Sequence, residues 1–250
     1  MLPLFGIVVL GGNVLLLGCF IIGVMGVREF FNGFKNLGIR PAYFVAYISA
    51  VALYAINILG LHEKWFMFWV YGVIIASLLH LFNAKKRKIE DGAMTMTGIF
   101  YVIFLSYHVT LTEQIEGHSI MVWLIFLTAF GTDVMAYFTG MAFGKRKLCP
   151  NISPKKTVEG SIGGIVGSIV LCGVFGHFFA PEVLIHCMII GALGGVISQF
   201  GDLTASVFKR KMDIKDYGNL IPGHGGILDR FDSVLFTAPL VYYYIMFVIL

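Results

Sequence analysis

Long apolar stretches follow one another along almost the whole chain, and they leave little sequence for a water-soluble domain. A membrane-spanning helix needs about 20 apolar residues, because the hydrocarbon core of a bilayer is about 30 Å thick. We place eight such stretches, approximately at residues 4–25, 42–60, 65–82, 94–111, 119–142, 162–180, 183–201 and 233–250. The sequence therefore predicts an all-α, polytopic integral membrane protein with about eight transmembrane helices and a single membrane domain over residues 1–250.

The composition agrees with a membrane protein. Hydrophobic residues make up 58% of the chain and charged residues 13%, whereas soluble domains have about 45–50% and about 25%. The first apolar stretch resembles a signal peptide or a lipoprotein leader, with Cys19 placed as in a cleavage site. Such leaders begin with basic residues, and residues 1–27 contain no Lys or Arg, so we expect a retained helix.

Basic residues are distributed unevenly between the predicted loops. With eight spans, 17 of the 18 Lys and Arg residues fall in loops on one side of the membrane, and only Lys64 falls on the other. Lys and Arg in short loops are retained on the cytoplasmic side. We therefore predict that both termini face outward and that the long loops 143–161 and 202–232 are cytoplasmic. A catalytic or binding site would then lie at the cytoplasmic face.

The formal net charge of +4 does not indicate a nucleic-acid partner. The basic residues follow membrane topology and do not form the large patch that nucleic-acid binding requires. Their expected partners are the lipid bilayer, through its anionic headgroups, and phosphate groups.

Carboxylates gather where the last two predicted spans meet their connecting loop. Asp202 lies at the end of the seventh span, and Asp229 lies just before the eighth. Asp232 follows Asp229 by three residues, so the two share one face of a helix. Carboxylates fixed on neighbouring helices are natural ligands for Mg²⁺. The alternative is that they are simply solvated at the membrane surface, which is the interpretation we prefer for Asp213.

A glycine-rich segment, residues 222–226, lies between these carboxylates and reads Pro-Gly-His-Gly-Gly. Glycines let backbone N–H groups approach an anion closely, but they also occur in tight turns that need a positive φ. Cationic side chains flank this segment on both sides and favour a phosphate-binding role: Lys209, Arg210, Lys215 and Arg230.

The other long loop repeats the pattern of cations beside glycines. Ser153, Pro154, Lys155, Lys156 and Thr157 precede a glycine-rich span. Adjacent lysines at a membrane surface are often only topological anchors. The neighbouring hydroxyl and carboxyl groups of Ser153, Thr157 and Glu159 make that explanation incomplete and leave a phosphate-binding role open.

The polar residues Asp133, His108 and Asn57 lie inside predicted spans. Asp133 is the only acid there, and an intramembrane carboxylate usually faces a cavity or a partner. His108 and Asn57 are expected to form hydrogen bonds between helices. Small residues recur every four positions and predict close helix packing rather than catalysis: Gly160, Gly164 and Ser168, then Gly191 and Gly195.

The C-terminal motif resembles the signature of the phosphatidate cytidylyltransferases, the bacterial CDP-diacylglycerol synthases. The pattern S-x-x-K-R-x(4)-K-D-x(5)-P-G-H-G-G-x-x-D-R-x-D matches at every fixed position from Ser206 to Asp232. Asp133, Ala136, Tyr137 and Gly140 resemble the family's D-x-x-A-Y-x-x-G segment, and residues 152–160 resemble its S-P-K-K-T-x-E-G segment. The resemblance spans roughly residues 128–235. Towards the N-terminus, Arg28 precedes Glu29 where family members more often have an aromatic residue before the acid.

The resemblance implies an enzyme, a nucleotidyltransferase of phospholipid biosynthesis. It would transfer the cytidylyl group of CTP to phosphatidate and give CDP-diacylglycerol and pyrophosphate. Residues 126–250 would supply the catalytic helices and cytoplasmic loops, and residues 1–125 would add N-terminal helices without an assigned role. The resemblance also implies a multi-pass protein of the bacterial inner membrane, with a homodimer as one arrangement.

By the same resemblance, Asp202 and Asp229 would be the principal ligands of Mg²⁺, with a second cation as an open alternative. Asp216 and Asp232 would be further ligands or would orient Lys215 and Arg230. The implied catalytic residues are Asp202, Asp229, Lys209, Arg230 and His224. The implied substrate-binding residues are Ser153, Lys155, Lys156, Thr157, Ser206, Arg210, Lys215, Gly225, Gly226 and Asp133. We interpret His224 as a phosphate donor or turn residue rather than a base, because a phosphate monoester is already ionised near neutral pH.

Two other functions were weighed against this one. A transporter would account for Asp133 and His108 inside the bilayer, but residues 1–125 and 126–250 show no self-similarity of the kind that transporters often have. The D-G-x-x-A-R motif of the CDP-alcohol phosphotransferases is absent. A related CTP-dependent enzyme that acts on another lipid phosphate or a lipid alcohol stays open.

Overall fold

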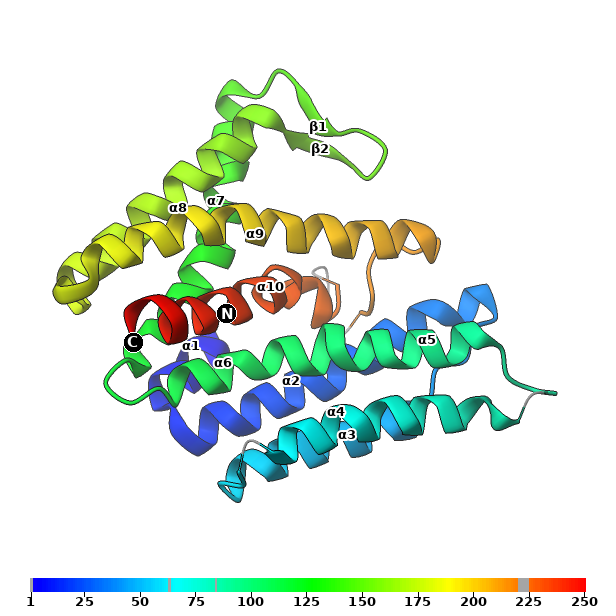
Figure 1. Ribbon diagram of the computed structural model, residues 1–250. Coiled ribbons are helices and arrows are strands. Elements are labelled where there is room, and N and C mark those ends of the chain that lie inside the picture. Colours follow the sequence, from blue (N-terminus) through cyan, green and yellow to red (C-terminus); the bar gives the residue numbers. More distant parts are fainter. Residues whose placement is uncertain (1, 63, 84, 220–224) are drawn as a thin grey trace. The chain divides into compact units, whose positions relative to one another are not determined.

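The computed structural model describes residues 2–62, 64–83, 85–219 and 225–250, and within these ranges the chain is almost entirely helical (Figure 1). The α-helices are α1 (Leu2–Leu10), α2 (Gly12–Gly33), α3 (Tyr43–Ile58), α4 (Lys64–Leu79), α5 (Ile89–Gly98), α6 (Leu105–Glu113), α7 (Val122–Phe143), α8 (Val158–Phe179), α9 (Leu184–Lys211) and α10 (Leu228–Tyr244). Short 3-10 or π-helical segments adjoin them: η1 (Phe34–Leu37), η2 (His80–Phe82), η3 (Ile99–Phe104), η4 (Ser119–Met121), η5 (Pro181–Val183) and η6 (Ile245–Ile249).

Seven helical stretches of the described chain are long and apolar enough to cross a membrane. They are Gly12–Leu37, Lys64–Phe82, Ile89–Glu113, Ser119–Phe143, Val158–Phe179, Pro181–Lys211 and Leu228–Ile249. The apolar helix Tyr43–Ile58 coincides with the remaining predicted span but has only 16 residues. The structure thus confirms a helical, polytopic membrane protein. The count of eight spans and their orientation stay predictions.

Two predicted helix boundaries are wrong. The first apolar stretch is not one helix, because Gly11 (φ 59°) and Gly12 (φ 50°) adopt left-handed backbone conformations that separate α1 from α2. The seventh does not stop near residue 201, since α9 continues without a break to Lys211. Hydropathy marks where apolar residues end, whereas a helix ends only where its backbone is broken. Asp202, Ser206 and the basic residues up to Lys211 are therefore helical and do not belong to a loop.

The predicted loop 143–161 contains two short strands, which an all-α prediction does not include. Strands β1 (Lys147–Cys149) and β2 (Ser153–Thr157) pair antiparallel and form a hairpin (Figure 1). Thr157 then caps α8, because its hydroxyl oxygen accepts the Gly160 N–H at 3.1 Å. The hairpin thereby leads directly into the first turn of α8.

The chain divides into two compact units. Unit 1 comprises Met1–Tyr107 and Lys211–Arg230, and unit 2 comprises His108–Arg210 and Phe231–Leu250. The core of unit 1 surrounds Phe30 and Phe31, whose side chains are fully buried. The ring of Phe30 contacts that of Tyr217, at 6.2 Å between centroids, so the segment after α9 packs on α2. The prediction of a single membrane domain stays a prediction.

Helices α7, α8 and α9 of unit 2 pack closely through small residues, as predicted. A Cβ atom added to Gly164 would lie 2.9 Å from the backbone oxygen of Thr132, and one added to Gly160 would lie 2.8 Å from that of Ala136. Gly191 makes the same close approach to the backbone of α8. These contacts are too short for any side chain, so glycine sets the distances between the three helices. His108 is buried, and its ring packs against the rings of Tyr242 and Tyr243.

A glycine-to-alanine pair tests this packing. Gly191→Ala places a Cβ atom 2.8 Å from the Ser168 backbone oxygen, so α8 and α9 must separate. Overpacking of this kind costs about 1–3 kcal/mol, and we expect a lower midpoint of thermal unfolding in detergent. Gly72→Ala in α4 is the matched control, because no atom lies within 4 Å of the added Cβ. Equal midpoints for the two variants would contradict the packing role of Gly191.

Candidate active site

A cavity of about 370 Å³ opens in unit 2 between α7, α8, α9 and the β1–β2 hairpin. It is lined by Asp133, Ala136, Tyr137, Gly140, Met141, Leu148, Lys155, Lys156, Thr157, Gly160, Ser161 and Gln199. The two family-like segments of the sequence, residues 133–144 and 152–160, therefore face one space. They meet because α7 and α8 approach closely at Gly140 and Gly160. A Cβ atom added to Gly140 would lie only 3.5 Å from the Gly160 Cα atom.

The hairpin that carries the two cavity lysines is fastened at its base. The carboxylate of Glu159 accepts the backbone N–H groups of Lys145 and Arg146 at 3.0 and 3.1 Å. The Val158 N–H donates to the Arg146 backbone oxygen at 2.9 Å. Both ends of the hairpin are thus held at the start of α8. Lys155 and Lys156 are thereby presented to the cavity by a fixed backbone.

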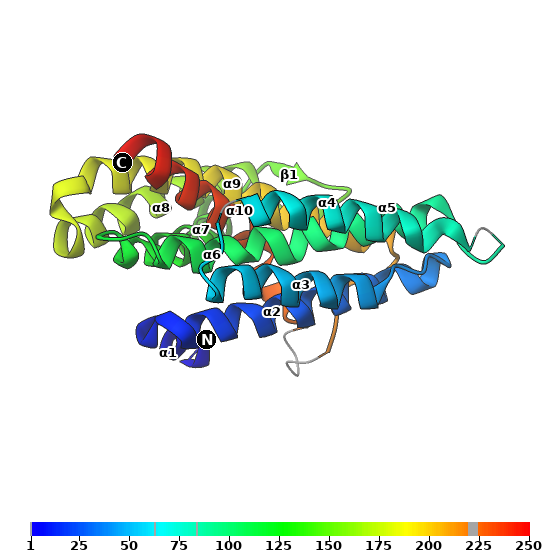
Figure 2. The ribbon, with the colours of Figure 1, turned by 60° about the horizontal axis from the view of Figure 1, so that its bottom comes forward.

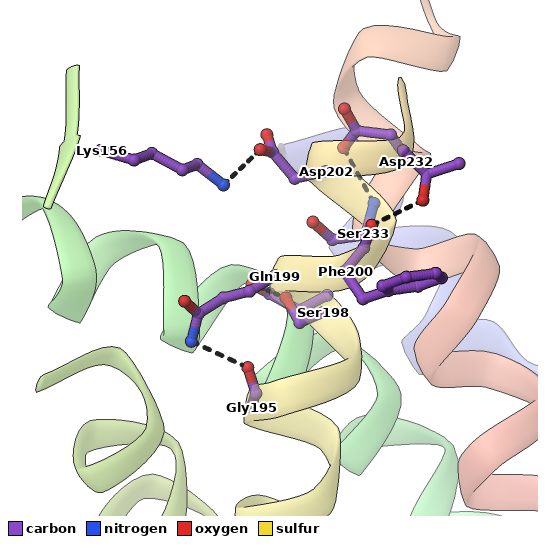
Figure 3. A network of polar contacts seen from close by, with 10 residues as sticks. Lys156, Gly195, Ser198, Gln199, Phe200, Asp202, Asp232 and Ser233 are labelled. Atoms are coloured by element: carbon purple, nitrogen blue, oxygen red, sulfur yellow. Dashed lines mark hydrogen bonds and ion pairs between the residues drawn. The ribbon is translucent and has the colours of Figure 1, made fainter. Parts of the chain in front are cut away.

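An ion pair connects the hairpin to α9. Lys156 Nζ contacts Asp202 Oδ2, and both side chains are about one quarter exposed, at 26% and 27% (Figure 3). The same oxygen of Asp202 is buried and accepts no hydrogen bond of standard geometry within the described residues. Near Asp202 on the same helix, the Gln199 side chain donates to the Ser161 backbone oxygen at 3.1 Å. Asp202 therefore presents a negative oxygen to a cation beside the cavity.

A second carboxylate lies close to Asp202 within unit 2. Asp232, in α10, is only 6% exposed, and its Oδ1 atom accepts the Ser233 N–H at 2.8 Å. Asp232 interacts electrostatically with Asp202, Lys209 and Asp133. The two helices approach closely because a Cβ at Gly201 would lie 2.9 Å from the Asp232 backbone oxygen. Two carboxylates and two lysines are thereby gathered at one place.

This arrangement is chemically suited to phosphates and a divalent cation. No group of three or more His, Cys, Asp or Glu side chains is placed to hold a metal ion within the described ranges. Mg²⁺ does not need such a group, because it commonly takes one or two carboxylates and fills its other positions with water and substrate phosphates. The buried Asp202 oxygen and the neighbouring Asp232 carboxylate fit that donor set.

In unit 1, Asp229 fastens the segment that leads to α10. Its Oδ2 atom accepts the backbone N–H groups of Tyr217 and Gly226, at 2.8 and 2.9 Å. Gly225 has φ 83°, so the turn that needs a positive φ is present at this position. A Cβ at Gly225 would lie 2.9 Å from Asp229 Oδ2 and 3.4 Å from Asp216 Oδ1. The glycine therefore allows both carboxylates to approach the backbone.

Glu29 fastens the same segment from α2, a contact that the sequence did not predict. Its two carboxylate oxygens accept the Ile227 and Leu228 N–H groups at 3.1 and 2.9 Å. Gly218 and Gly226 pack on this carboxylate, and a side chain at either position would collide with it. Glu29 and Leu228 are 199 residues apart, so no spacing rule connects them. The available signal was that Glu29 is the only acid among residues 1–62.

The remaining predicted site residues are placed as follows. Ser206, Lys209 and Arg210 lie on α9, and the Arg210 Nε–H donates to the Ile152 backbone oxygen at 3.4 Å. Ser153 lies at the start of β2, and Arg230 lies in the first turn of α10. Lys215 and Asp216 lie in the segment between α9 and α10. His224 lies outside the described residues, as do Pro222 and Gly223.

The predicted residues thus form two groups. Unit 2 brings together Asp133, Lys155, Lys156, Thr157, Asp202, Lys209 and Asp232. Unit 1 brings together Asp216, Gly225, Gly226 and Asp229. Joint binding of one metal ion by Asp202 and Asp229 stays a prediction.

Comparison with known proteins finds similarity along nearly the whole chain. The cytidylyltransferase family matches residues 1–248. A phosphatidate cytidylyltransferase of Synechocystis sp. is 35% identical over 271 residues, covering 97% of this chain and 92% of that protein. A phosphatidate cytidylyltransferase of Staphylococcus epidermidis is 34% identical and covers 92% and 89% of the two chains. One of Bacillus subtilis is 41% identical over a shorter region, covering 62% and 58%. The similarity thus includes the N-terminal half, which the sequence motifs do not reach.

Removing the charge of Glu29 tests whether it fastens the backbone at Ile227 and Leu228. Glu29→Gln keeps one acceptor oxygen but loses a charge-assisted hydrogen bond, which is worth about 1.5–3 kcal/mol. We expect hydrogen exchange at the Ile227 and Leu228 amides to become at least about tenfold faster, measured by mass spectrometry on the detergent-purified protein. Glu90→Gln, an exposed acid in the first turn of α5, is the matched control. Unchanged exchange at these amides in Glu29→Gln would refute the contact.

Proposed function

Because the chain belongs to the cytidylyltransferase family, we propose that it transfers the cytidylyl group of CTP to phosphatidate, making CDP-diacylglycerol and releasing pyrophosphate. The observation that carries this proposal is the match to phosphatidate cytidylyltransferases over nearly the full length of both chains. The cavity of unit 2 supports it, since cations that can bind phosphates and carboxylates that can bind a metal ion occur together there.

The reaction brings together two polyanions. A phosphate oxygen of phosphatidate forms a bond to the α-phosphorus of CTP, and the bond between that phosphorus and the oxygen bridging to the β-phosphate breaks as pyrophosphate leaves. The attacking phosphate is already ionised near neutral pH and needs no strong base. Catalysis therefore depends on positioning the two phosphates and neutralising their charge.

The two cavity lysines are the proposed phosphate ligands. Lys155 and Lys156 line the cavity from β2, and Thr157 lies beside them. Lys156 now pairs with Asp202, so it would exchange this carboxylate for a phosphate oxygen when substrate binds. Ser153, Ser206, Lys209, Arg210, Lys215, Arg230, Gly225, Gly226 and His224 complete the proposed contacts to the two substrates. Asp133, on the α7 side of the cavity, would line the space for the lipid or the nucleotide.

Asp202 would hold a Mg²⁺ ion, with Asp229 as the other principal ligand that the sequence signature suggests and with Asp216 and Asp232 as further ligands. The support within this chain is the buried oxygen of Asp202 beside a second carboxylate. A bound Mg²⁺ ion supplies positive charge at phosphate oxygens.

We place the site at the cytoplasmic face of a bacterial inner membrane, with eight spans and both termini outside. The loop charges support this orientation, and the similar proteins named above come from bacteria. CTP is a cytoplasmic nucleotide, so a cytoplasmic site would give it direct access. A homodimer is the proposed assembly.

The decisive experiment is a transfer assay on the purified protein. With labelled CTP, phosphatidate and Mg²⁺, we expect labelled CDP-diacylglycerol, and we expect EDTA to abolish its formation. Asp202→Asn should lower turnover about 100-fold or more, the order of magnitude for losing one charged group that stabilises a transition state. Asp229→Asn should abolish the activity without unfolding the protein.

Asp213→Asn is the matched control for these variants. Asp213 has φ 55°, a conformation that asparagine also adopts readily. The Asp213→Asn variant should therefore keep its activity within about twofold of the wild-type activity. Full activity in Asp202→Asn would remove this residue from the catalytic site. A wild-type protein that transfers CTP only to another lipid phosphate would leave the family intact and change the substrate.

A further inference from the structure

Unit 1 contains a basic pocket that the proposed reaction does not use. It has a volume of about 410 Å³ and is lined by Gly38, Arg40, Lys85, Lys86, Lys88 and Asp91. Four of these six residues are cationic, and none belongs to the proposed catalytic or substrate-binding residues. We call this feature the basic pocket.

The backbone of the basic pocket is fixed by one buried carboxylate. Asp91 is only 2% exposed, and it accepts the Arg40 N–H at 2.7 Å and the Lys88 N–H at 3.0 Å. The Ala42 N–H donates to the Thr95 hydroxyl at 2.8 Å, which holds the same segment one turn further along α5. The segment after η1 is thereby fastened to the start of α5. The backbone of Arg40 and Lys88 is held at the pocket by these bonds.

The charge in the basic pocket favours an anion. The carboxylate of Asp91 is buried and accepts two backbone N–H groups, so these bonds already offset part of its negative charge. The N-terminal end of α5 adds further positive potential, because its first N–H groups point out of the helix. Membrane topology requires only that basic residues lie on one side. It does not require four of them to converge on one pocket.

The position of the basic pocket identifies the occupant as a lipid. The apolar stretches Gly12–Leu37 and Lys64–Phe82 end beside it, and Ile89–Glu113 begins there. Figures 1 and 2 both show these ends at the same end of unit 1. Large apolar side chains are exposed next to it, Phe82 at 82% and Ile89 at 80%. A phosphate with attached acyl chains matches cations and exposed apolar groups together, whereas a soluble phosphate matches only the cations.

We propose that the basic pocket binds the phosphate headgroup of an anionic membrane lipid, whose acyl chains lie along Phe82 and Ile89. Arg40, Lys85, Lys86 and Lys88 contact the phosphate. This site shares no lining residue with the proposed catalytic site, and the proposal stands whether or not the proposed reaction is correct.

Lipid counting by native mass spectrometry tests the proposal. The full-length protein is released from nanodiscs that contain phosphatidylglycerol in an excess of phosphatidylcholine, and the lipids that stay bound are identified. We expect the wild-type protein to retain phosphatidylglycerol selectively. The double variant Lys85→Gln/Lys86→Gln removes two exposed charges from a turn and should weaken this retention about thirtyfold, given the usual contribution of a lysine near an anionic lipid.

Lys145→Gln/Lys147→Gln is the matched control, because it removes two basic charges from another predicted cytoplasmic loop and should keep the lipid. Phe82→Ala should weaken retention of long-chain phosphatidylglycerol more than that of a short-chain form. Three results would overturn the proposal: equal retention by wild type and Lys85→Gln/Lys86→Gln, equal loss in the control, or displacement of the lipid by inorganic phosphate at equal concentration. Displacement by CTP would place the retained lipid in the catalytic cavity and would also overturn it.

Discussion

Backbone N–H groups at a helix start or in a non-helical segment near a membrane need hydrogen-bond acceptors from the protein. In this chain, carboxylates supply these acceptors repeatedly. Glu29, Asp91, Glu159 and Asp229 each accept two backbone N–H groups from a non-helical segment or a helix start. A hydrogen bond to a charged acceptor is about twice as strong as a neutral one, so each carboxylate holds its segment firmly. The basic side chains that these segments carry are consequently positioned by hydrogen bonds at their base. This is the reason that short, polar connections can serve as binding surfaces here.

Small residues provide the second condition, because charged groups interact strongly only when their helices lie close together. Gly201 allows α9 to approach the backbone of Asp232, and this approach brings two carboxylates and Lys209 into one electrostatic group. Gly140 and Gly160 do the same for α7 and α8, so that Asp133 faces the hairpin lysines across the cavity. A larger side chain at any of these glycines would separate the charges as well as the helices. Packing and electrostatics in unit 2 are therefore set by the same residues.

The sequence predicts those features that depend on composition over a helix length. Apolar stretches of suitable length correspond to helices, because lipid leaves the backbone no alternative to internal hydrogen bonds. The prediction from sequence failed where a helix extends beyond the apolar region. The residues of α9 beyond Phe200 are polar and resemble a loop, but none of them breaks the helix. It also failed for the short hairpin, whose residues were assigned to a loop. Glu29 could not be paired with the 226–228 backbone, because only the folded chain brings them together.

The acids of the C-terminal motif look alike in the sequence, but they divide by the use of their oxygens. Asp229 commits Oδ2 to the backbone of the segment before α10, so this residue shapes the segment whatever else it binds. Asp202 makes no such commitment with Oδ2, which is buried and faces the Lys156 ammonium. A buried carboxylate oxygen without hydrogen-bond donors is costly unless a cation approaches it. That cost favours a site in which another cation replaces Lys156 beside Asp202 when the substrate binds. Lys156 can then release the Asp202 carboxylate and bind a substrate phosphate.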